Sequence, residues 1–229
     1  WGWYDAGQGI TETGGLVDSW ADQSGNSNTL TSTSTNRPTY NATGGPNNLS
    51  YLDFDGIDDY LTTAVSTTLT TGEYSVFIVF VDDANWNWRR IWGYGYSDQY
   101  AGQIQHSNTV NRWRLWNGAH QSSGTTYYDE TTSMLNTGVW GVFSFIGSGN
   151  NASGNSVQQN GLTYLNGALP SNFPLSPTSQ MVVGSSPHGT ITSDTFDGKI
   201  AECIIYDSAL SQTDMIRVEN YLNRKYRIY

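Results

Sequence analysis

The apolar positions of residues 74–83 (YSVFIVFVDD) fall on both alternating faces of an extended chain. A strand with two apolar faces is typical of the centre of a sheet that is covered on both sides. The run KIAECIIY at 199–206 is β-branched and apolar in the same way. We therefore predict two buried central strands, one in the first half of the chain and one near its end.

Further strand-like segments follow one another with turn residues, rather than helices, between them. They include 51–61, 85–96, 108–118, 138–149 and 161–169. The last segment, GLTYLNGAL, contains Asn166-Gly167, a dipeptide typical of a two-residue hairpin turn, so we predict a hairpin that turns there. A succession of strands without intervening helices is typical of a β-sandwich or a barrel.

The helical spacing of apolar residues appears only near the end of the chain. Ser211 is a good N-cap residue, and Asp214 stands three positions later, as in a capping box. Apolar residues then recur at intervals of three and four, at Met215, Val218, Leu222 and Tyr226. No internal repeat or long linker divides the chain. We predict a single all-β domain over residues 1–229 that ends in one short amphipathic helix.

Composition narrows the classes of partner. Only 13% of the 229 residues are charged, and the formal net charge is −10. Nucleic acids and anionic membrane surfaces both attract cationic proteins, so neither is expected as a partner. No apolar run is long enough to insert into a bilayer. Nine Trp and fifteen Tyr residues among polar, uncharged loops favour an extracellular binding surface, and the single Cys203 lies in an apolar run typical of a buried thiol.

Motifs at both ends of the chain resemble one family. The segments are WYDAG (3–7), VDSWADQSGNSN (17–28), RPTY (37–40), YLDFDGIDDYL (51–61), FDGKIAECIIYDSALS (196–211) and VENYLNRKY (218–226). Together they resemble the laminin-G-like branch of the concanavalin A-like lectin/glucanase jelly rolls, in the form common in bacterial and phage proteins. The resemblance implies two antiparallel sheets packed face to face, one of them concave. Members of that family mostly bind glycans or proteins, and a subset are glycosidases or polysaccharide lyases.

Four carboxylates within seven residues form a candidate calcium site. They are Asp53, Asp55, Asp58 and Asp59. Calcium takes six to eight oxygen ligands, and an acidic loop of this kind can supply several, although the spacing differs from that of an EF-hand. The alternative is a turn in which the Asp side chains accept hydrogen bonds from backbone amides. Asp194 and Asp197 are further possible ligands.

Catalytic motifs are not apparent. Retaining glycosidases of this superfamily are recognised by a strand motif that places two carboxylates on one face. The sequence lacks this motif. Glu202 is expected to share a face with Ile200 and Ile204 and to have the structural hydrogen-bonding role that the resemblance implies. The segment GQIQH offers Gln103, Gln105 and His106, which only partly match a lyase motif. We therefore predict that the chain is not an enzyme.

Two central segments combine indole rings with guanidinium groups. Aromatic faces stack on the C–H side of sugar rings, and Arg binds carboxylate or sulfate through two parallel hydrogen bonds. The alternative is that the Trp rings fill the core while the Arg residues lie on a convex surface. The predicted ligand-binding residues are Trp86, Trp88, Arg90, Arg112, Arg114 and Trp116.

These features predict a non-catalytic carbohydrate-binding or adhesion domain of an extracellular, cell-surface or virion-associated protein. Its partner would be a carbohydrate or a host-surface glycan, and the domain could form a homo-oligomer or a larger assembly. Two alternatives remain open. The first is a structural decoration or fibre protein, or a protein-interaction domain, whose aromatic surface packs on another subunit. The second is a lyase or glycosidase that acts on a polysaccharide.

Overall fold

The computed structural model describes residues 1–64, 73–83, 89–96, 99–106, 113–116, 127–129, 137–148, 155–167, 180–186 and 194–229. Within parts of these ranges (96, 99–106, 113–116, 127–129, 148 and 165–167) it describes the path of the backbone only. The described residues form a nearly all-β antiparallel sandwich with a short C-terminal helix, which confirms the predicted fold class.

One sheet is built around the two long strands that the apolar pattern predicts. Its order is β15–β14–β13–β8–β17, and two short strands, β6 and β1, lie end to end along the other edge of β17. The bounds are β1 (Gly2–Asp5), β6 (Tyr51–Asp55), β8 (Glu73–Asp82), β13 (Gly141–Ser148), β14 (Asn155–Gln159), β15 (Leu162–Gly167) and β17 (Asp197–Tyr206).

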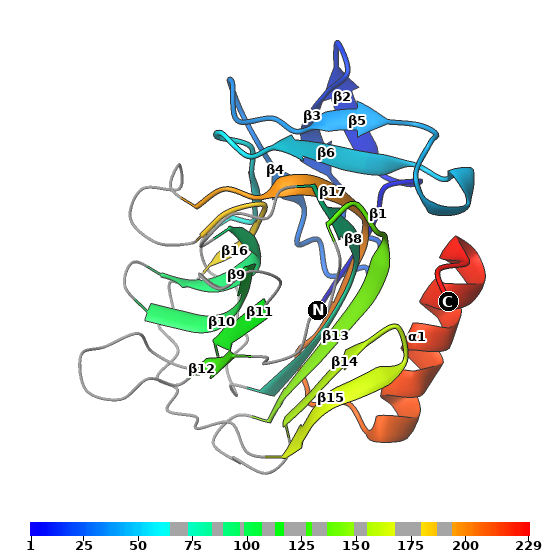
Figure 1. Ribbon diagram of the computed structural model, residues 1–229. Helices are drawn as coiled ribbons and strands as arrows, with labels where there is room; N and C mark the ends of the chain where they lie inside the picture. The colour runs from blue at the N-terminus through cyan, green and yellow to red at the C-terminus, as the bar shows by residue number, and fades with distance from the viewer. Residues whose placement is uncertain are drawn as a thin grey trace.

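The second sheet has the order β4–β7–β16–β9–β10–β11–β12. Its strands are β4 (Leu30–Thr31), β7 (Leu61–Thr62), β9 (Arg90–Tyr96), β10 (Gln99–His106), β11 (Trp113–Trp116), β12 (Tyr127–Asp129) and β16 (Gln180–Val183). Three further strands, β2 (Ile10–Thr13), β3 (Leu16–Trp20) and β5 (Thr39–Asn41), join the two sheets at one edge, because β3 pairs with both β4 and β5, and β5 pairs with β6. Figure 1 shows the two sheets facing each other.

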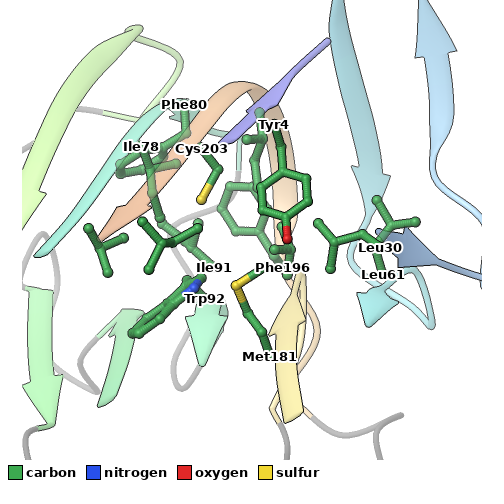
Figure 2. Close-up of a cluster of buried hydrophobic side chains, with 14 of the residues drawn as sticks. Tyr4, Leu30, Leu61, Ile78, Phe80, Ile91, Trp92, Met181, Phe196 and Cys203 are labelled. Atoms are coloured by element: carbon green, nitrogen blue, oxygen red, sulfur yellow. The ribbon is translucent and has the colours of Figure 1, made fainter. Parts of the chain in front are cut away.

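Strand β8 has a hydrophobic core on each side, as its two apolar faces predict. Ile78 and Phe80 belong to the core between the sheets, together with the indole of Trp92 in β9 (Figure 2). Phe77 and Val79 belong to a second core, between this sheet and the C-terminal helix. The prediction that residues 74–83 form a central strand covered on both sides is confirmed.

The C-terminal helix α1 (Gln212–Tyr226) covers the outer side of the sheet that contains β13 and β8 (Figure 1). Ser211 is its N-cap, and the Ser211 hydroxyl accepts a hydrogen bond from the backbone N–H of Asp214 at 3.2 Å. Met215, Leu222 and Tyr226 are buried against the sheet, as predicted. Within the described part of the chain, no helix has both the length and the apolar character that a membrane crossing requires.

The same face of α1 also buries a charged residue that the apolar pattern did not predict. Glu219 is 3% exposed, and its carboxylate accepts a hydrogen bond from the Ser144 hydroxyl in β13. Burial raises the pKa of Glu219. The helix is therefore held to the sheet by a buried polar contact as well as by apolar packing.

Strand β17 contains a bulge that changes which side chains face the helix. The pairing with β8 shifts between Ile200 and Glu202, so that Ala201 is the additional residue. Ile200 faces the core between the sheets, whereas Ala201 and Ile204 face α1. Glu202 also faces α1, where it contacts Tyr221 and Tyr226. The prediction that Glu202 shares a face with Ile204 is therefore confirmed, and the prediction that it shares one with Ile200 is wrong, because simple alternation does not hold across a bulge.

The prediction of a hairpin that turns at Asn166-Gly167 is wrong, because residues 162–167 form the single strand β15 and the turn lies before it. Asn160 and Gly161, both with positive φ, connect β14 to β15. Asn166 and Gly167 lie within β15, where they pair with Ser156 and Asn155. The side-chain oxygen of Asn160 also accepts a hydrogen bond from the Val142 N–H at 2.8 Å, which ties this turn to β13. That tertiary contact distinguishes two dipeptides that are locally equivalent.

Candidate functional site

The predicted aromatic and arginine residues are only partly within the described ranges. Trp86, Trp88 and Arg112 lie outside the described residues. Arg114 and Trp116 lie in β11, for which the backbone alone is described. Arg90 is the first residue of β9 and is described in full.

The backbone register nevertheless brings the two predicted segments close together. Strand β10 lies between β9 and β11, and Gln105 pairs with Arg90 on one side and with Arg114 on the other. Neighbouring strands are about 4.8 Å apart, so the backbone positions of Arg90 and Arg114 are separated by roughly 10 Å. The described parts of the two segments, residues 90–96 and 113–116, therefore lie in one sheet with only β10 between them.

The described side chains of β9 divide between core and surface. Trp92 and Tyr94 are 0% and 2% exposed and belong to the core between the sheets, which is the alternative considered for these rings. The guanidinium of Arg90 makes an ion pair with Asp194 at 3.0 Å, and the Arg90 side chain as a whole is 12% exposed. Arg90 therefore lies at the surface end of the strand, already bound to a carboxylate.

Arg90 belongs to a larger group of charges that we call the acidic rim. It is formed where the end of β6, the end of β8, the start of β9 and the start of β17 meet. Seven carboxylates surround three cations here. The residues are Asp53, Asp55, Asp58, Asp59, Asp83, Asp194 and Asp197 with Arg89, Arg90 and Lys199.

Three of these carboxylates form a compact group that contains no cation from the described part of the chain; we call Asp55, Asp58 and Asp59 the Asp trio. One carboxylate oxygen from each can be chosen so that all three lie within 4.8 Å of one another. Each residue uses one oxygen in a hydrogen bond: Asp55 accepts from the Ile57 N–H and Asp59 from the Asp55 N–H within the turn, and Asp58 accepts from the hydroxyl of the distant Thr35. These hydrogen bonds fit the alternative to a metal site, a turn whose Asp side chains accept hydrogen bonds from nearby groups. However, no member of the trio makes an ion pair with any other described residue.

The electrostatics of the trio favour a cation. Asp59 is 5% exposed, and burial together with the neighbouring Asp55 and Asp58 raises the pKa of Asp59 to about 6. A bound divalent cation would remove this repulsion, and carboxylate oxygens are the ligands that calcium prefers. Three carboxylates fall short of the six to eight oxygens of calcium, so water or the ligand itself would complete the coordination.

Asp53 is separate from the trio, because it lies within β6 opposite Lys199 and Thr39. Lys199 makes an ion pair with Asp83. Arg89 makes an ion pair with Asp197 at 3.3 Å, and its guanidinium lies against Gly56 at a position that a methyl side chain would occupy. Arg89 therefore joins the turn of the trio to the start of β17. Its role depends on contacts between distant segments, which no sequence motif signals.

A second group of carboxylates lies beside α1 and is fully satisfied. Glu202 is 0% exposed and accepts hydrogen bonds from Trp3 Nε1 at 2.7 Å, Tyr221 OH at 3.0 Å and Tyr226 OH at 2.8 Å. The Lys225 ammonium lies between two carboxylates, at 2.6 Å from Glu202 and 2.7 Å from Asp5. The structural role predicted for Glu202 fits these contacts. The involvement of Asp5 was not predicted, because only the pairing of β1 with β17 places it opposite Glu202.

The remaining sequence candidates are three residues of the GQIQH segment and the single cysteine. Gln103, Gln105 and His106 lie in β10, where the backbone alone is described. Cys203 is 1% exposed, and burial raises the pKa of its thiol, so the thiol is held in the unreactive form.

The sequence matches no known protein family and no curated protein. Solved structures do share the fold. Domain 4 of AbnA, a GH43 extracellular arabinanase from Geobacillus stearothermophilus determined in complex with arabinotriose, matches with a TM-score of 0.67 and 16% identity over 95% of this chain and 97% of that domain. Trypanosoma rangeli sialidase in complex with sialic acid matches with a TM-score of 0.66 and 12% identity over 98% of this chain, which spans 33% of the sialidase chain. A heptameric SAP-like pentraxin from Limulus polyphemus matches with a TM-score of 0.58 and 15% identity, over 73% of this chain and 80% of the pentraxin chain.

These likenesses establish the β-sandwich and correct one prediction. The prediction that the chain is not an enzyme is contradicted, because the same fold occurs within the chains of a sialidase and an arabinanase. Identities of 11–16% among the solved structures show the fold alone. The neighbours share a lectin-like β-sandwich, and assignment to one superfamily is a finer statement that the fold does not make.

Proposed function

We propose that this chain is a carbohydrate-binding domain that holds its ligand at the end of the second sheet, next to the acidic rim. The observation that carries the proposal is the register of β9, β10 and β11, which sets Arg90 and Arg114 opposite the same residue, Gln105. The described strands of the two segments rich in Trp and Arg, β9 and β11, thereby lie in one part of the sheet. The full-length likeness to a domain determined in complex with arabinotriose supports the same class of ligand.

The acidic rim gives this site a second component. The Asp trio is well suited to a calcium ion, because it combines three clustered carboxylates with a raised pKa at Asp59. Calcium held there would stabilise the turn at residues 55–59, against which Arg89 packs. Arg89 directly precedes Arg90 in the chain, so the metal and the sugar site would share one stretch of backbone.

The area that one stacked aromatic ring buries sets the expected strength of binding. One stacked ring that buries ~150–250 Å² contributes at most roughly 4–6 kcal/mol before the entropic losses of association. A net free energy near −4 kcal/mol corresponds to a dissociation constant of about a millimolar. A single site of this strength is useful when several copies act together, so display on a larger extracellular, cell-surface or virion assembly, or in a homo-oligomer, stays our prediction.

A glycan array probed with the purified chain, clustered on beads to give multivalency, tests the proposal. We expect binding to a defined set of glycans and loss of that binding in the double variant Trp116→Ala/Arg114→Ala. The matched control is Trp140→Ala/Arg37→Ala, which removes the same residue types where they face α1 and Asp18, away from the proposed site. Unchanged binding by the first variant would remove the proposed site.

An enzyme that acts on a polysaccharide is the second candidate. Gln105 lies between Arg90 and Arg114 in the register, and lyases neutralise a uronate carboxylate with groups of these types. Assays for reducing ends and for unsaturated products, run over plant, algal and bacterial glycans, distinguish this candidate from simple binding. Product formation that a Gln105→Ala variant loses would favour it.

A further inference from the structure

An open hollow of about 390 Å³ lies where β1 and the last residues of β17 meet α1, at the other end of β17 from the acidic rim. Its lining is mostly aromatic and aliphatic. The residues that matter here are Trp3, Ile204, Tyr206, Arg217, Val218 and Tyr221. We call this the aromatic hollow.

Two rings of the aromatic hollow are fixed by hydrogen bonds at their polar ends. Trp3 Nε1 and Tyr221 OH both donate to Oε1 of the buried Glu202, at 2.7 and 3.0 Å. The two rings meet edge to face, with centroids 6.5 Å apart. Because the polar atoms are bound in the interior, the rings are held rigidly and ligand contact involves their apolar parts.

A basic hollow of about 500 Å³ adjoins the aromatic one and shares Arg217 and Tyr221 with it. Arg217, Asn220, Tyr221 and Arg224 line it and are exposed along one face of α1. The Arg217 side chain is 74% exposed, and among the described residues it makes an ion pair with Asp214 alone. Arg224 makes no ion pair with any described residue. Four of the ten lysines and arginines of this acidic chain lie between residues 217 and 227.

We infer that α1 and the adjoining end of β17 bind an anionic oligosaccharide, with sugar rings against Trp3, Tyr206 and Tyr221 and a carboxylate or sulfate group at Arg217 and Arg224. Fixed aromatic walls match the C–H faces of a sugar, and guanidinium groups match its anionic substituents. Charge complementarity selects this ligand over a neutral glycan, because the basic hollow is a cationic surface on a chain of net charge −10.

This site is distinct from the one under the proposed function. The acidic rim adjoins Asp197, the first residue of β17, and the aromatic hollow adjoins Tyr206, the last. Nine residue steps of an extended strand span roughly 30 Å, so one short oligosaccharide does not reach both. The inference shares with the proposed function only the general class of ligand.

The test is a pair of calorimetric titrations with trigalacturonate and with the corresponding neutral galactose trisaccharide. We expect trigalacturonate to bind at least roughly tenfold more tightly than the neutral sugar, and we expect added salt to weaken it. The variant Arg217→Gln/Arg224→Gln should lose roughly tenfold or more of the affinity for trigalacturonate. The control Arg227→Gln removes the same charge from the exposed end of α1, outside both hollows, and should stay within about twofold of the unmodified chain.

The outcome separates the two sites. Trigalacturonate binding that survives Trp116→Ala/Arg114→Ala but not Arg217→Gln/Arg224→Gln supports the inference, whether or not the proposed function holds. Binding that Arg217→Gln/Arg224→Gln leaves unchanged overturns it, as does the absence of trigalacturonate binding to the unmodified chain. A heparin-derived tetrasaccharide, titrated in the same way, shows whether sulfate is preferred to carboxylate.

Discussion

Two groups of carboxylates lie beside β17, and they differ in how their charge is balanced. Asp5 and Glu202 are almost completely buried, yet they share one ammonium, and Glu202 also accepts hydrogen bonds from three aromatic side chains. Asp55, Asp58 and Asp59 are as closely grouped, but among the described residues they have backbone amides and one hydroxyl as partners, and no cation. Both contain the residue types of an active site. The pair of Asp5 and Glu202, whose charge is balanced, supports the fold, whereas the Asp trio is where we predict a further cation.

The largest predicted effect comes from removing the shared cation, with Lys225→Met. Asp5 and Glu202 would then be buried next to each other without compensation, and leaving such a charge unpaired costs about 3–5 kcal/mol. Urea denaturation followed by tryptophan fluorescence measures the loss. The comparison variant is Lys199→Met, whose partner Asp83 is about one-third exposed, and we expect a loss below about 1 kcal/mol. Equal losses in the two variants would contradict the distinction between the two groups.

Calcium should act on the other group. At a free calcium concentration 100 times its dissociation constant, binding to the folded state raises the free energy of unfolding by about 2.7 kcal/mol. The rise in Tm seen on adding calcium should disappear in Asp59→Asn and persist in Asp207→Asn, which neutralises an exposed carboxylate elsewhere. An equal rise in Asp59→Asn would show that calcium, if bound, lies at another place.

The pH dependence of calcium binding sharpens the assignment to Asp59. Its pKa is raised from 3.8 to about 6, so protons compete with the metal below that pH. Between pH 7 and pH 5 we expect the affinity for calcium to fall roughly tenfold, which isothermal titration at the two pH values measures. Affinity that stays constant over this range would mean that Asp59 is not a ligand.

Without calcium the same raised pKa has the opposite consequence for stability. The folded state holds the Asp59 proton more tightly than the unfolded state, so this group stabilises the fold most at low pH, and that contribution is lost as the pH rises through about 6. In Asp59→Asn, the decline between pH 4 and pH 6 should be smaller, as measured by urea denaturation in EDTA. A decline of the same size would assign it to other groups, such as Glu219, whose pKa is raised as well.

The smallest predicted effect concerns the helix that supplies Lys225. Ser211→Ala removes the N-cap acceptor of the Asp214 N–H, which costs about 1 kcal/mol of stability. Thr213→Ala, an exposed position in the first turn, should change stability by less than about half of that. An unchanged free energy of unfolding in Ser211→Ala would show that other contacts of α1 set the stability of its first turn.

Periodicity and local motifs predicted those parts of the fold that depend on neighbouring residues. The two-faced strand at 74–83 and the helix after Ser211 are confirmed, because alternation and capping are properties of short segments. The choice of Asn160-Gly161 over Asn166-Gly167 and the bulge at Ala201 were not predicted, because each is decided by a partner strand distant in sequence.

The candidate site was predictable to a smaller extent. Density of acidic residues predicted a group of four carboxylates, of which Asp55, Asp58 and Asp59 form the Asp trio and Asp53 does not. Composition singled out segments 85–96 and 108–118. What composition could not predict is pairing: Arg90 with Asp194, Arg89 with Asp197 and Asp5 with Glu202 all join residues at least 100 positions apart. The sequence around a charged residue does not reveal whether the fold leaves that charge in solvent or neutralises it with a distant partner.

The bulge at Ala201 has a consequence for how this chain tolerates length changes. The bulge separates the half of β17 that pairs with β6 from the half that pairs with β1. In each half, side chains alternate between the core and the opposite face independently of the other half. Ala201 and Glu202 both face α1, so loss of Ala201 would leave Ile200 facing the core and Glu202 facing the helix. Turns at the rim can likewise lengthen or shorten without disturbing the helix side. The rim half is therefore the part of the sandwich that can vary in loop length, and with it in specificity, while the helix half stays constant.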